Sequence, residues 1–431
     1  MSKKILIPFL FLLLGICSCT KDTVTDYPVV EITSPYSLAT FNVPGTIQVT
    51  GYVSDSKSLT SVTVYIGNSQ NIPVEQTITV PITSNTMNVS LTYYLDDIHM
   101  LSGQYYMTIT ASNGTNTASA FQQIYVDGTP TVRTAIYAIS HNSGGVQVWK
   151  IDSLFHASLS YTVSGDYSSS DINSYYQQLY TAGLDSGNVN VYSVPNIASD
   201  WSLSGIVSTT PYFTNIYCNN DAEYVSYHLG YVKCYNHLGT LETIYNVNSG
   251  YYPVKTFAWA GWLFAEEKSI YSTSENLLTF YQASAAGAGQ IVIQGPIVAM
   301  YGYDNNDIFV FGNSSGGAYM QLYNIRTNLF YSPVTMPSAK LLSVAQVNAS
   351  TYLISFNNGT IYQYTYGQNG LFPYINGISA STLCYDNINN QIITATGNTI
   401  NEYNYGINSA NLVASAIISD SIRDLSVLYN K

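Results

Sequence analysis

Four residues in one short stretch carry side chains that could bind or cleave a sugar. Trp259 and Trp262 precede Glu266 and Glu267, the only Glu-Glu pair in the sequence. Two carboxylates can act as acid and base on a glycosidic bond, and tryptophan rings can stack on sugar rings. Adjacent residues of a strand point to opposite faces, so in a regular strand the two glutamates cannot share one site. We therefore treat the four as candidate ligand-binding residues and assign no catalytic residue.

Other patterns of reactive residues indicate turns and packing. The Asp- and Asn-rich segments 303–307 and 385–390 resemble calcium loops, but neither has the Gly at position 6 and Glu at position 12 of an EF-hand. Asp and Asn favour tight turns, and calcium binding is the alternative. The five histidines form no HExxH motif, and no GxSxG segment or P-loop occurs. We expect no metal site and no cofactor.

The N-terminus has the pattern of a secretory signal. Two lysines precede an apolar run of twelve residues, Ile5 to Ile16, which is shorter than the ~20 residues that span a bilayer. The run ends in Ile-Cys-Ser-Cys19, which resembles the lipobox of bacterial lipoproteins, and the residues that follow resemble surface lipoproteins of the Bacteroidota. The resemblance implies a signal peptide over 1–18, a lipid on Cys19 and a tether over 19–27. It also implies an outer-membrane location, on the periplasmic or the cell-surface side.

Composition restricts the partners. Removing residues 1–18 takes away two lysines and no acid, so the net charge changes from −12 to −14. Such a surface repels phosphate backbones, and nucleic acid is not an expected partner. Charged residues make up 9% of the chain, against a typical ~25%. The 41 tyrosines and the many uncharged polar residues suit an extracellular β-protein.

Residues 28–127 predict a small β-sandwich. Short β-rich segments, some with alternating apolar and polar residues, occur at 29–32, 47–50, 62–65, 89–92, 105–109 and 123–126. About seven short strands in ~100 residues fit a two-sheet sandwich. Segments 32–35 and 51–55 resemble bacterial Ig-like domains, which implies an Ig-like fold. Residues 127–130 read Asp-Gly-Thr-Pro and indicate a domain boundary.

Residues 133–431 contain an internal repeat, in which a glycine, a few alternating residues and an aromatic recur. The aromatics are Trp149, Tyr192, Tyr235, Tyr323, Tyr364 and Tyr403. Their spacings are 43, 43, 88, 41 and 39, so one copy is hidden near residue 279, where Phe280 and Tyr281 lie. A period of ~40–45 with four strands per copy is typical of β-propellers. The region resembles seven-bladed WD-repeat propellers, without the Gly-His and Trp-Asp dipeptides of that family.

The two ends of the repeat region predict ring closure. The first copy has three strands, at 134–140, 145–151 and 157–163, and one extra strand remains at 424–429. One strand plus three makes a blade, so we expect the last strand to complete the first blade. The same scheme puts Cys218 and Cys234 on the first and third strands of one blade, roughly 9.6 Å apart. A disulfide needs Cα atoms within about 7 Å, so we expect both cysteines, and Cys384, to be free and largely buried.

The chain is thus predicted to be all-β, with an Ig-like β-sandwich followed by a seven-bladed β-propeller. The first functional hypothesis is a non-enzymatic binding or scaffold module, in which the propeller binds a glycan or a protein partner. The alternative is a polysaccharide lyase or glycoside hydrolase built on the propeller. Residues 133–431 hold 9 basic and 17 acidic residues. This sparseness favours binding, whereas a cluster of charges at one channel mouth would favour catalysis.

Overall fold

The computed structural model describes residues 26–194, 196–206, 210–219 and 221–431. Every helix or strand assigned in this part of the chain is a β-strand, so the predicted all-β class is confirmed. None of the described residues forms a helix that is long and apolar enough to cross a bilayer. The predicted signal peptide and Cys19 lie outside the described residues. The chain divides into two compact units, Met1–Pro130 and Thr131–Lys431.

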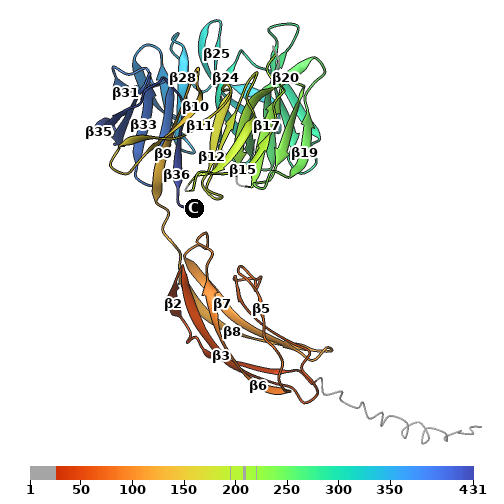
Figure 1. Ribbon diagram of the computed structural model, residues 1–431. Helices are drawn as coiled ribbons and strands as arrows, with labels where there is room; N and C mark the ends of the chain where they lie inside the picture. The colour runs from red at the N-terminus through yellow and green to blue at the C-terminus, as the bar shows by residue number, and fades with distance from the viewer. Residues whose placement is uncertain (1–25, 195, 207–209, 220) are drawn as a thin grey trace, which may run out of the picture. The chain divides into compact units, whose positions relative to one another are not determined.

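The first unit is a sandwich of two sheets (Figure 1). One sheet contains, in order, β1 (Val29–Ser34), β3 (Gly45–Ser54) and β6 (Thr86–Leu95). The other contains β2 (Ala39–Asn42), β8 (Thr117–Asp127), β7 (Gly103–Ser112), β4 (Ser61–Gly67) and β5 (Ile78–Thr79). Alternate residues of β3 are apolar and buried, among them Ile47, Val49 and Val53. This period of two turns one face of each strand to the core between the sheets.

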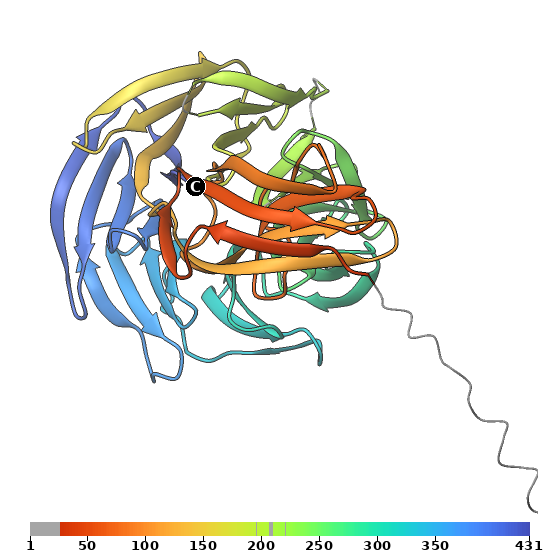
Figure 2. The same cartoon turned by 90° about the horizontal axis from the view of Figure 1, so that it is seen from below.

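In the second unit, the described residues form seven four-stranded sheets, the blades of a β-propeller. Figure 2 shows the blades around a common axis. Blade one contains β36 (Ile422–Tyr429), β9 (Arg133–Asn142), β10 (Gly145–Ile151) and β11 (Ala157–Val163). Blade two contains β12 (Ser169–Asn173), β13 (Gln178–Ala182), β14 (Val189–Ser193) and β15 (Ala198–Leu203). Blade three contains β16 (Phe213–Asn219), β17 (Ala222–Tyr227), β18 (Tyr231–Tyr235) and β19 (Leu241–Asn246).

The remaining four blades follow in chain order. Blade four contains β20 (Tyr251–Trp259), β21 (Trp262–Ser269), β22 (Glu275–Tyr281) and β23 (Gly287–Val292). Blade five contains β24 (Ile297–Gly302), β25 (Asp307–Ser314), β26 (Gly317–Asn324) and β27 (Leu329–Tyr331). Blade six contains β28 (Leu341–Asn348), β29 (Thr351–Phe356), β30 (Thr360–Thr365) and β31 (Phe372–Asn376). Blade seven contains β32 (Thr382–Asp386), β33 (Gln391–Thr396), β34 (Thr399–Tyr405) and β35 (Ala410–Ile417).

The last strand of the chain closes the ring. β36 pairs with β9 in antiparallel register, from Ile422 opposite Ser140 to Tyr429 opposite Arg133. This is the pairing that the extra strand at the end of the sequence predicts. In Figure 2 the blue last blade lies beside the yellow first blade. Without β36, this edge of β9 would be unpaired. Unpaired sheet edges promote aggregation.

The recurring aromatics of the sequence fill the seams between blades. Each lies on the third strand of its blade and packs toward the preceding blade. Tyr235 of blade three joins a cluster with Tyr180 of blade two, and Tyr323 of blade five joins Phe264 of blade four. Phe280, from the hidden copy, packs against Tyr224 of blade three. One large ring per repeat is therefore the packing unit that sets the period of about 42 residues.

The cysteines follow the predicted strand order. Cys218 lies on β16 and Cys234 on β18, with β17 between them, and neither forms a disulfide. Cys234 is buried, whereas Cys218 and Cys384 are partly exposed. Within the described part of the chain, all three thiols are free.

Candidate functional site

One face of the propeller gathers the ends of the first strands. In blades two to seven, the first strand turns there into the second, as β20 does into β21 through Ala260 and Gly261. The chain also enters and leaves the ring at this face, where the backbone N–H of Val132 donates to the Asn430 side chain at 2.9 Å. Figure 1 shows the C-terminus and the start of β9 at the same end of the ring. We call this face the mouth face.

The first strands line a central channel. Its cavity of about 710 Å³ is bordered by residues of β12, β16, β20, β24, β28, β32 and β36. Most of the polar lining is serine and threonine. The charged residues that border the channel are Asp171, Asp424, Lys255 and Arg423. The side-chain ammonium of Lys255 donates to the backbone oxygen of Val298 at 2.7 Å. The channel thus holds charges of both signs.

Burial dominates the titration of these channel groups. The pKa of Asp171 is raised to about 7, because desolvation outweighs the hydrogen bond from the Cys218 backbone N–H at 2.7 Å. Burial also raises the pKa of Asp424, which accepts a hydrogen bond from Ser170 at 2.9 Å, and lowers the pKa of Lys255. These side chains are partly exposed toward the channel, but the surrounding blades enclose them, which explains their strong desolvation.

A second cavity, of about 450 Å³, opens at the mouth face. Its lining comes from the strand ends and adjoining turns of blades four, five, six, seven and one. The residues are Trp259, Gly302, Gln346, Val347, Asn348, Ala349, Tyr385, Asn387 and Tyr429. We call it the mouth pocket. Its volume falls in the ~300–1,000 Å³ range of small-molecule sites, and its lining combines aromatic rings with side-chain amides.

Trp259 forms a fixed aromatic wall of the mouth pocket. Its indole N–H donates to the backbone oxygen of Asp304 at 2.6 Å, and its ring lies against Gly302. A Cβ atom at position 302 would overlap the six-membered ring of the indole. Glycine is therefore required for this contact. Trp259 remains 37% exposed, which leaves part of the ring for a ligand.

The polar groups of the mouth pocket are positioned by bonds that occupy one end of each side chain. The Gln346 amino group donates to the backbone oxygen of Gly302 at 3.0 Å. The Asn348 carbonyl oxygen accepts the backbone N–H of Thr351 at 3.0 Å. The hydroxyl groups of Tyr385 and Tyr429 donate to Asn390 at 2.7 Å and to Asp386 at 3.1 Å. The opposite ends of these two amides form no other hydrogen bond within the described part of the chain, which leaves them available to a ligand.

The structure separates the four residues that the sequence grouped. Trp262 stands opposite Trp259 across a two-residue hairpin turn and packs on Tyr281, with ring centroids 4.4 Å apart. It does not line the mouth pocket. The left-handed backbone of both turn residues, Ala260 and Gly261, matches a type I′ turn. Of the two tryptophans, only Trp259 reaches the candidate site.

Glu266 and Glu267 are buried, so the sequence-based assignment of both as ligand-binding residues is corrected. Glu266 is 1% exposed and accepts the backbone N–H of Ile297 at 3.1 Å. Glu267 is fully buried and accepts hydrogen bonds from Asn276 at 2.8 Å and from the Asn248 backbone at 3.0 Å. The two carboxylates turn to opposite faces of β21, as adjacent strand residues must, and each holds neighbouring segments together.

The Asp- and Asn-rich segments act as turns. Asp304 accepts the backbone N–H groups of Asn306 and Asp307, at 2.7 and 2.9 Å. Asp386 accepts those of Ile388 and Asn389, at 3.0 and 3.2 Å. These bonds are the Asx turns that aspartate favours. No group of three or more His, Cys, Asp or Glu residues among the described residues is arranged to hold a metal ion.

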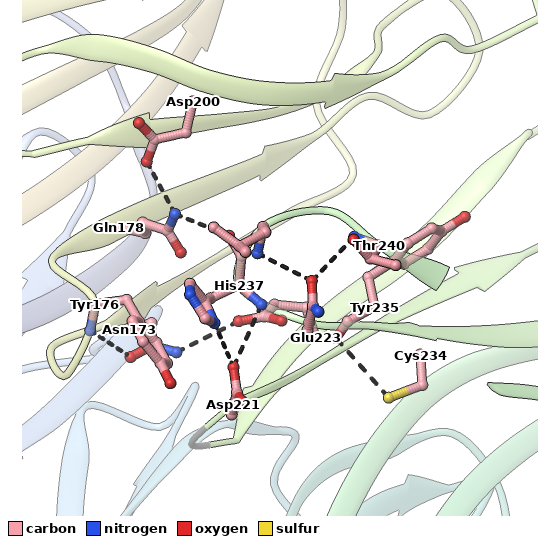
Figure 3. A network of polar contacts seen from close by, with 12 residues as sticks. Asn173, Tyr176, Gln178, Asp200, Asp221, Glu223, Cys234, Tyr235, His237 and Thr240 are labelled. Carbon is pink, nitrogen blue, oxygen red and sulfur yellow. Dashed lines mark hydrogen bonds and ion pairs between the residues drawn. The ribbon is translucent and has the colours of Figure 1, made fainter. Parts of the chain in front are cut away.

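A polar network at the seam between blades two and three also reaches the mouth face (Figure 3). The His237 ring lies 2.5 Å from the Asp221 carboxylate. It stacks on Tyr176 with centroids 3.7 Å apart and an interplanar angle of 3°. Behind this exposed pair lies Glu223, which is fully buried, and whose carboxylate faces Tyr180 at 2.8 Å. No sequence motif indicates this network, because its members come from separate turns of two blades.

Comparison with protein families agrees with the Ig-like fold of the first unit. A family model described as "Bacterial Ig domain" matches residues 28–192, which includes the sandwich and runs on into blades one and two. No curated protein matches the chain in sequence.

Three solved structures illustrate the similarity of the fold. A quinonprotein alcohol dehydrogenase-like protein from Bacteroides thetaiotaomicron shares 9% identity, with 93% of this chain and 99% of that one covered, at a TM-score of 0.49. The computationally designed Ika8 protein shares 13%, over 68% and 89%, at 0.49. The β-propeller domain of Cps50 (Swd1) from Myceliophteria thermophila shares 11%, over 60% and 88%, at 0.45. At such identities and scores these similarities carry no argument about ligand or activity. The chain combines an Ig-like sandwich with a β-propeller.

Proposed function

We propose that this protein is an extracytoplasmic lipoprotein, held at the outer membrane by a lipid on Cys19, whose propeller binds a glycan at the mouth pocket. The lipobox-like end of the signal sequence supports the anchor. Several acyl chains on one cysteine hold a protein firmly, whereas one chain holds it weakly. The Ig-like sandwich lies between the anchor and the propeller in the chain, and in this proposal it serves as a stalk.

The mouth pocket is the observation that carries the proposal. Trp259 is held by its own hydrogen bond and by the glycine beneath it. Sugar rings have apolar C–H faces that pack on aromatic rings, and hydroxyl groups that both donate and accept hydrogen bonds. Gln346, Asn348 and Asn387 supply amides of matching chemistry around the ring. A pre-arranged site of this kind loses little entropy when the ligand binds.

Binding fits the mouth pocket better than catalysis does. A glycosidase or lyase needs an acid and a base within reach of the scissile bond. The described residues that line the mouth pocket include no carboxylate and no imidazole. The carboxylates of the channel interior, Asp171 and Asp424, belong to the separate channel lining. Exposed Asp221 belongs to the seam of blades two and three. The sparse charge of the propeller is consistent with this arrangement.

The test uses soluble protein that starts at residue 20. We expect this protein to bind glycans on an array, and Trp259→Ala to lower affinity by roughly ten-fold or more, since a lost stacking contact costs about 1.4 kcal/mol or more. Tyr271→Ala is the matched control, because Tyr271 is an aromatic residue that is 85% exposed and lies in the turn between β21 and β22, away from the mouth face. Equal losses in both variants, or binding only to proteins, would overturn the proposal.

A further inference from the structure

The charged groups around the mouth pocket restrict the class of sugar that can bind there. The described lining residues of the mouth pocket carry no formal charge. The carboxylate of Asp386, which bonds to the lining residue Tyr429, has no exposed side-chain surface. Its oxygens accept hydrogen bonds from Tyr429 at 3.1 Å and from the Asn389 side chain at 2.8 Å. This carboxylate is therefore closed to a ligand.

The cation beside Asp386 is also paired and largely buried. Arg133 lies 3.1 Å from the Asp386 carboxylate and 2.8 Å from that of Glu402. It donates to Gln391 at 3.0 Å as well, and its side chain is only 13% exposed. Two carboxylates against one guanidinium leave this cluster with a net negative charge. An anionic sugar would meet repulsion and find no free cation in the lining, so its carboxylate or sulfate would lose hydration without compensation.

A cationic sugar would also gain little affinity from electrostatic attraction in the mouth pocket. Its counter-charge would have to come from the mouth pocket lining, which holds only amides, aromatic rings and apolar groups. The carboxylate of Asp304 lies outside this lining at an exposed position, where its Oδ1 accepts the turn N–H groups of Asn306 and Asp307 and solvent screens its charge. Side-chain amides are instead suited to neutral hydroxyl and acetamido groups, because an amide can both donate and accept.

We propose that the mouth pocket selects uncharged sugars, and that glycans bearing uronate, sulfate or free amino groups at the bound ring are excluded. This inference rests on the proposed function and adds the substrate class. The bound ring packs its apolar face on Trp259, and its hydroxyl or acetamido groups bond to Gln346, Asn348 and Asn387. Specificity arises because the mouth pocket offers no opposite charge to an acidic or amino sugar. Such a sugar would lose hydration on binding without compensation.

The contact between Trp259 and Gly302 allows a substitution that displaces the indole ring without removing a polar side chain from the mouth pocket. Gly302→Ala places a methyl group where the indole ring lies, so the ring must move. We expect a loss of affinity for neutral glycans of about ten-fold, comparable with that of Trp259→Ala. Gly316→Ala is the matched control, because a Cβ there meets only the Ser314 hydroxyl at 3.7 Å, and it should bind like the natural protein.

The decisive experiment compares ligands that differ only in charge. The soluble protein is screened on an array of neutral, acidic and amino glycans, and the best Trp259-dependent ligand is titrated beside its uronate and de-N-acetylated or amino counterparts. We expect the neutral form to bind at least about ten-fold more tightly. We also expect its affinity to stay constant between about 50 and 500 mM NaCl, because screening acts only on charged pairs.

The outcomes separate the two proposals. If no glycan of any class binds, or binding does not depend on Trp259, the proposed function fails. If the Trp259-dependent ligands are acidic or amino glycans whose affinity falls with salt, the proposed function stands and the inference of an uncharged ligand is overturned. Thermal melting of each variant confirms that a loss of binding reflects the mouth pocket rather than the fold.

Discussion

The hydroxyl oxygen of Tyr180 lies 2.8 Å from a carboxylate oxygen of Glu223 and 2.6 Å from the carbonyl oxygen of Gln178. The Gln178 amino group donates to Asp200 at 2.9 Å and to the backbone of His237 at 3.0 Å, which fixes the carbonyl end toward Tyr180. A hydroxyl group has one proton and cannot donate to both acceptors. Both contacts become hydrogen bonds when Glu223 is protonated and donates to Tyr180. The seam between blades two and three therefore favours a neutral Glu223.

This arrangement predicts a pH-dependent stability. Burial raises the pKa of Glu223 from 4.5 to about 7. The folded protein then holds a proton that the unfolded chain releases, so the stability from this group is complete below pH 4.5 and is lost as pH rises through 7. We expect the melting temperature of Glu223→Gln, relative to the natural protein, to rise by roughly 2–4 °C or more between pH 5 and pH 8. Differential scanning calorimetry measures this difference directly.

Other titrating groups near this seam must be separated from Glu223. The residues that interact with Glu223 through charge or hydrogen bonds are Asp221, His237, Tyr176, Tyr180, Cys218 and Cys234. Asp221→Asn is the control, because the Asp221 side chain is 58% exposed and its pKa is lowered rather than raised. The interpretation is wrong if Asp221→Asn shows the same rise with pH, or if Glu223→Gln follows the natural protein in parallel.

Arg133 is predicted to secure the ring where its two ends meet. It bridges Asp386 and Glu402 of blade seven from the first residue of β9. Arg133→Ala would leave two buried carboxylates unpaired, which costs about 3–5 kcal/mol and lowers the melting temperature by roughly 5–15 °C. Arg326→Ala, at an exposed position, should change it by only about 1–2 °C. Similar melting of the two variants would show that the Arg133 cluster does not stabilise closure.

The sequence could predict the ring because one aromatic per repeat packs between blades, and this requirement leaves a period that can be counted. It could not predict the burial of Glu266 and Glu267. Their strand, β21, is buried on both faces, and nothing in the local pattern shows that Asn248, Asn276 and the Ile297 backbone would satisfy the two carboxylates. The side-chain chemistry suggested a sugar site, but tertiary hydrogen bonds determined a structural role.

Of the residues that line the mouth pocket, the sequence pattern predicts only Trp259 as a ligand-binding residue. Its other walls come from equivalent positions of later repeats, and the signal was present in the sequence. Gly302, Gln346, Asn387 and Tyr429 follow Trp259 at intervals of 43, 44, 41 and 42 residues. An alignment of the repeats with one another would place these residues at equivalent positions. Their convergence on one pocket, however, depends on ring closure, which brings Tyr429 beside blade seven.

The anchor is tested by two neighbouring cysteines. Cys19 has a small residue before it, as the lipobox requires, whereas Cys17 follows the bulky Ile16. We expect Cys19→Ala to move the protein from the membrane to the soluble fraction and to abolish labelling with radioactive palmitate. Cys17→Ala should change neither. Continued palmitate labelling of Cys19→Ala would refute the assignment of the lipid to this residue.

The thiols of the mature protein test the order of strands in blade three. Cys218 and Cys234 are 16 residues apart in a chain expected to be secreted, where disulfides form readily. The strand β17 separates them, because Glu223 pairs with Cys218 and Tyr224 pairs with Cys234. Strands two apart in a sheet stand roughly 9.6 Å from each other, beyond the ~7 Å limit for the Cα atoms of a disulfide.

We therefore expect denatured, unreduced protein beginning at residue 20 to contain three reactive thiols, and Cys384→Ala to contain two. A bridge between Cys218 and Cys234 would instead give one thiol and none. Peptide mapping without reduction identifies such a bridge directly. Its presence would mean that β16 and β18 are neighbours, which would contradict the strand order of blade three.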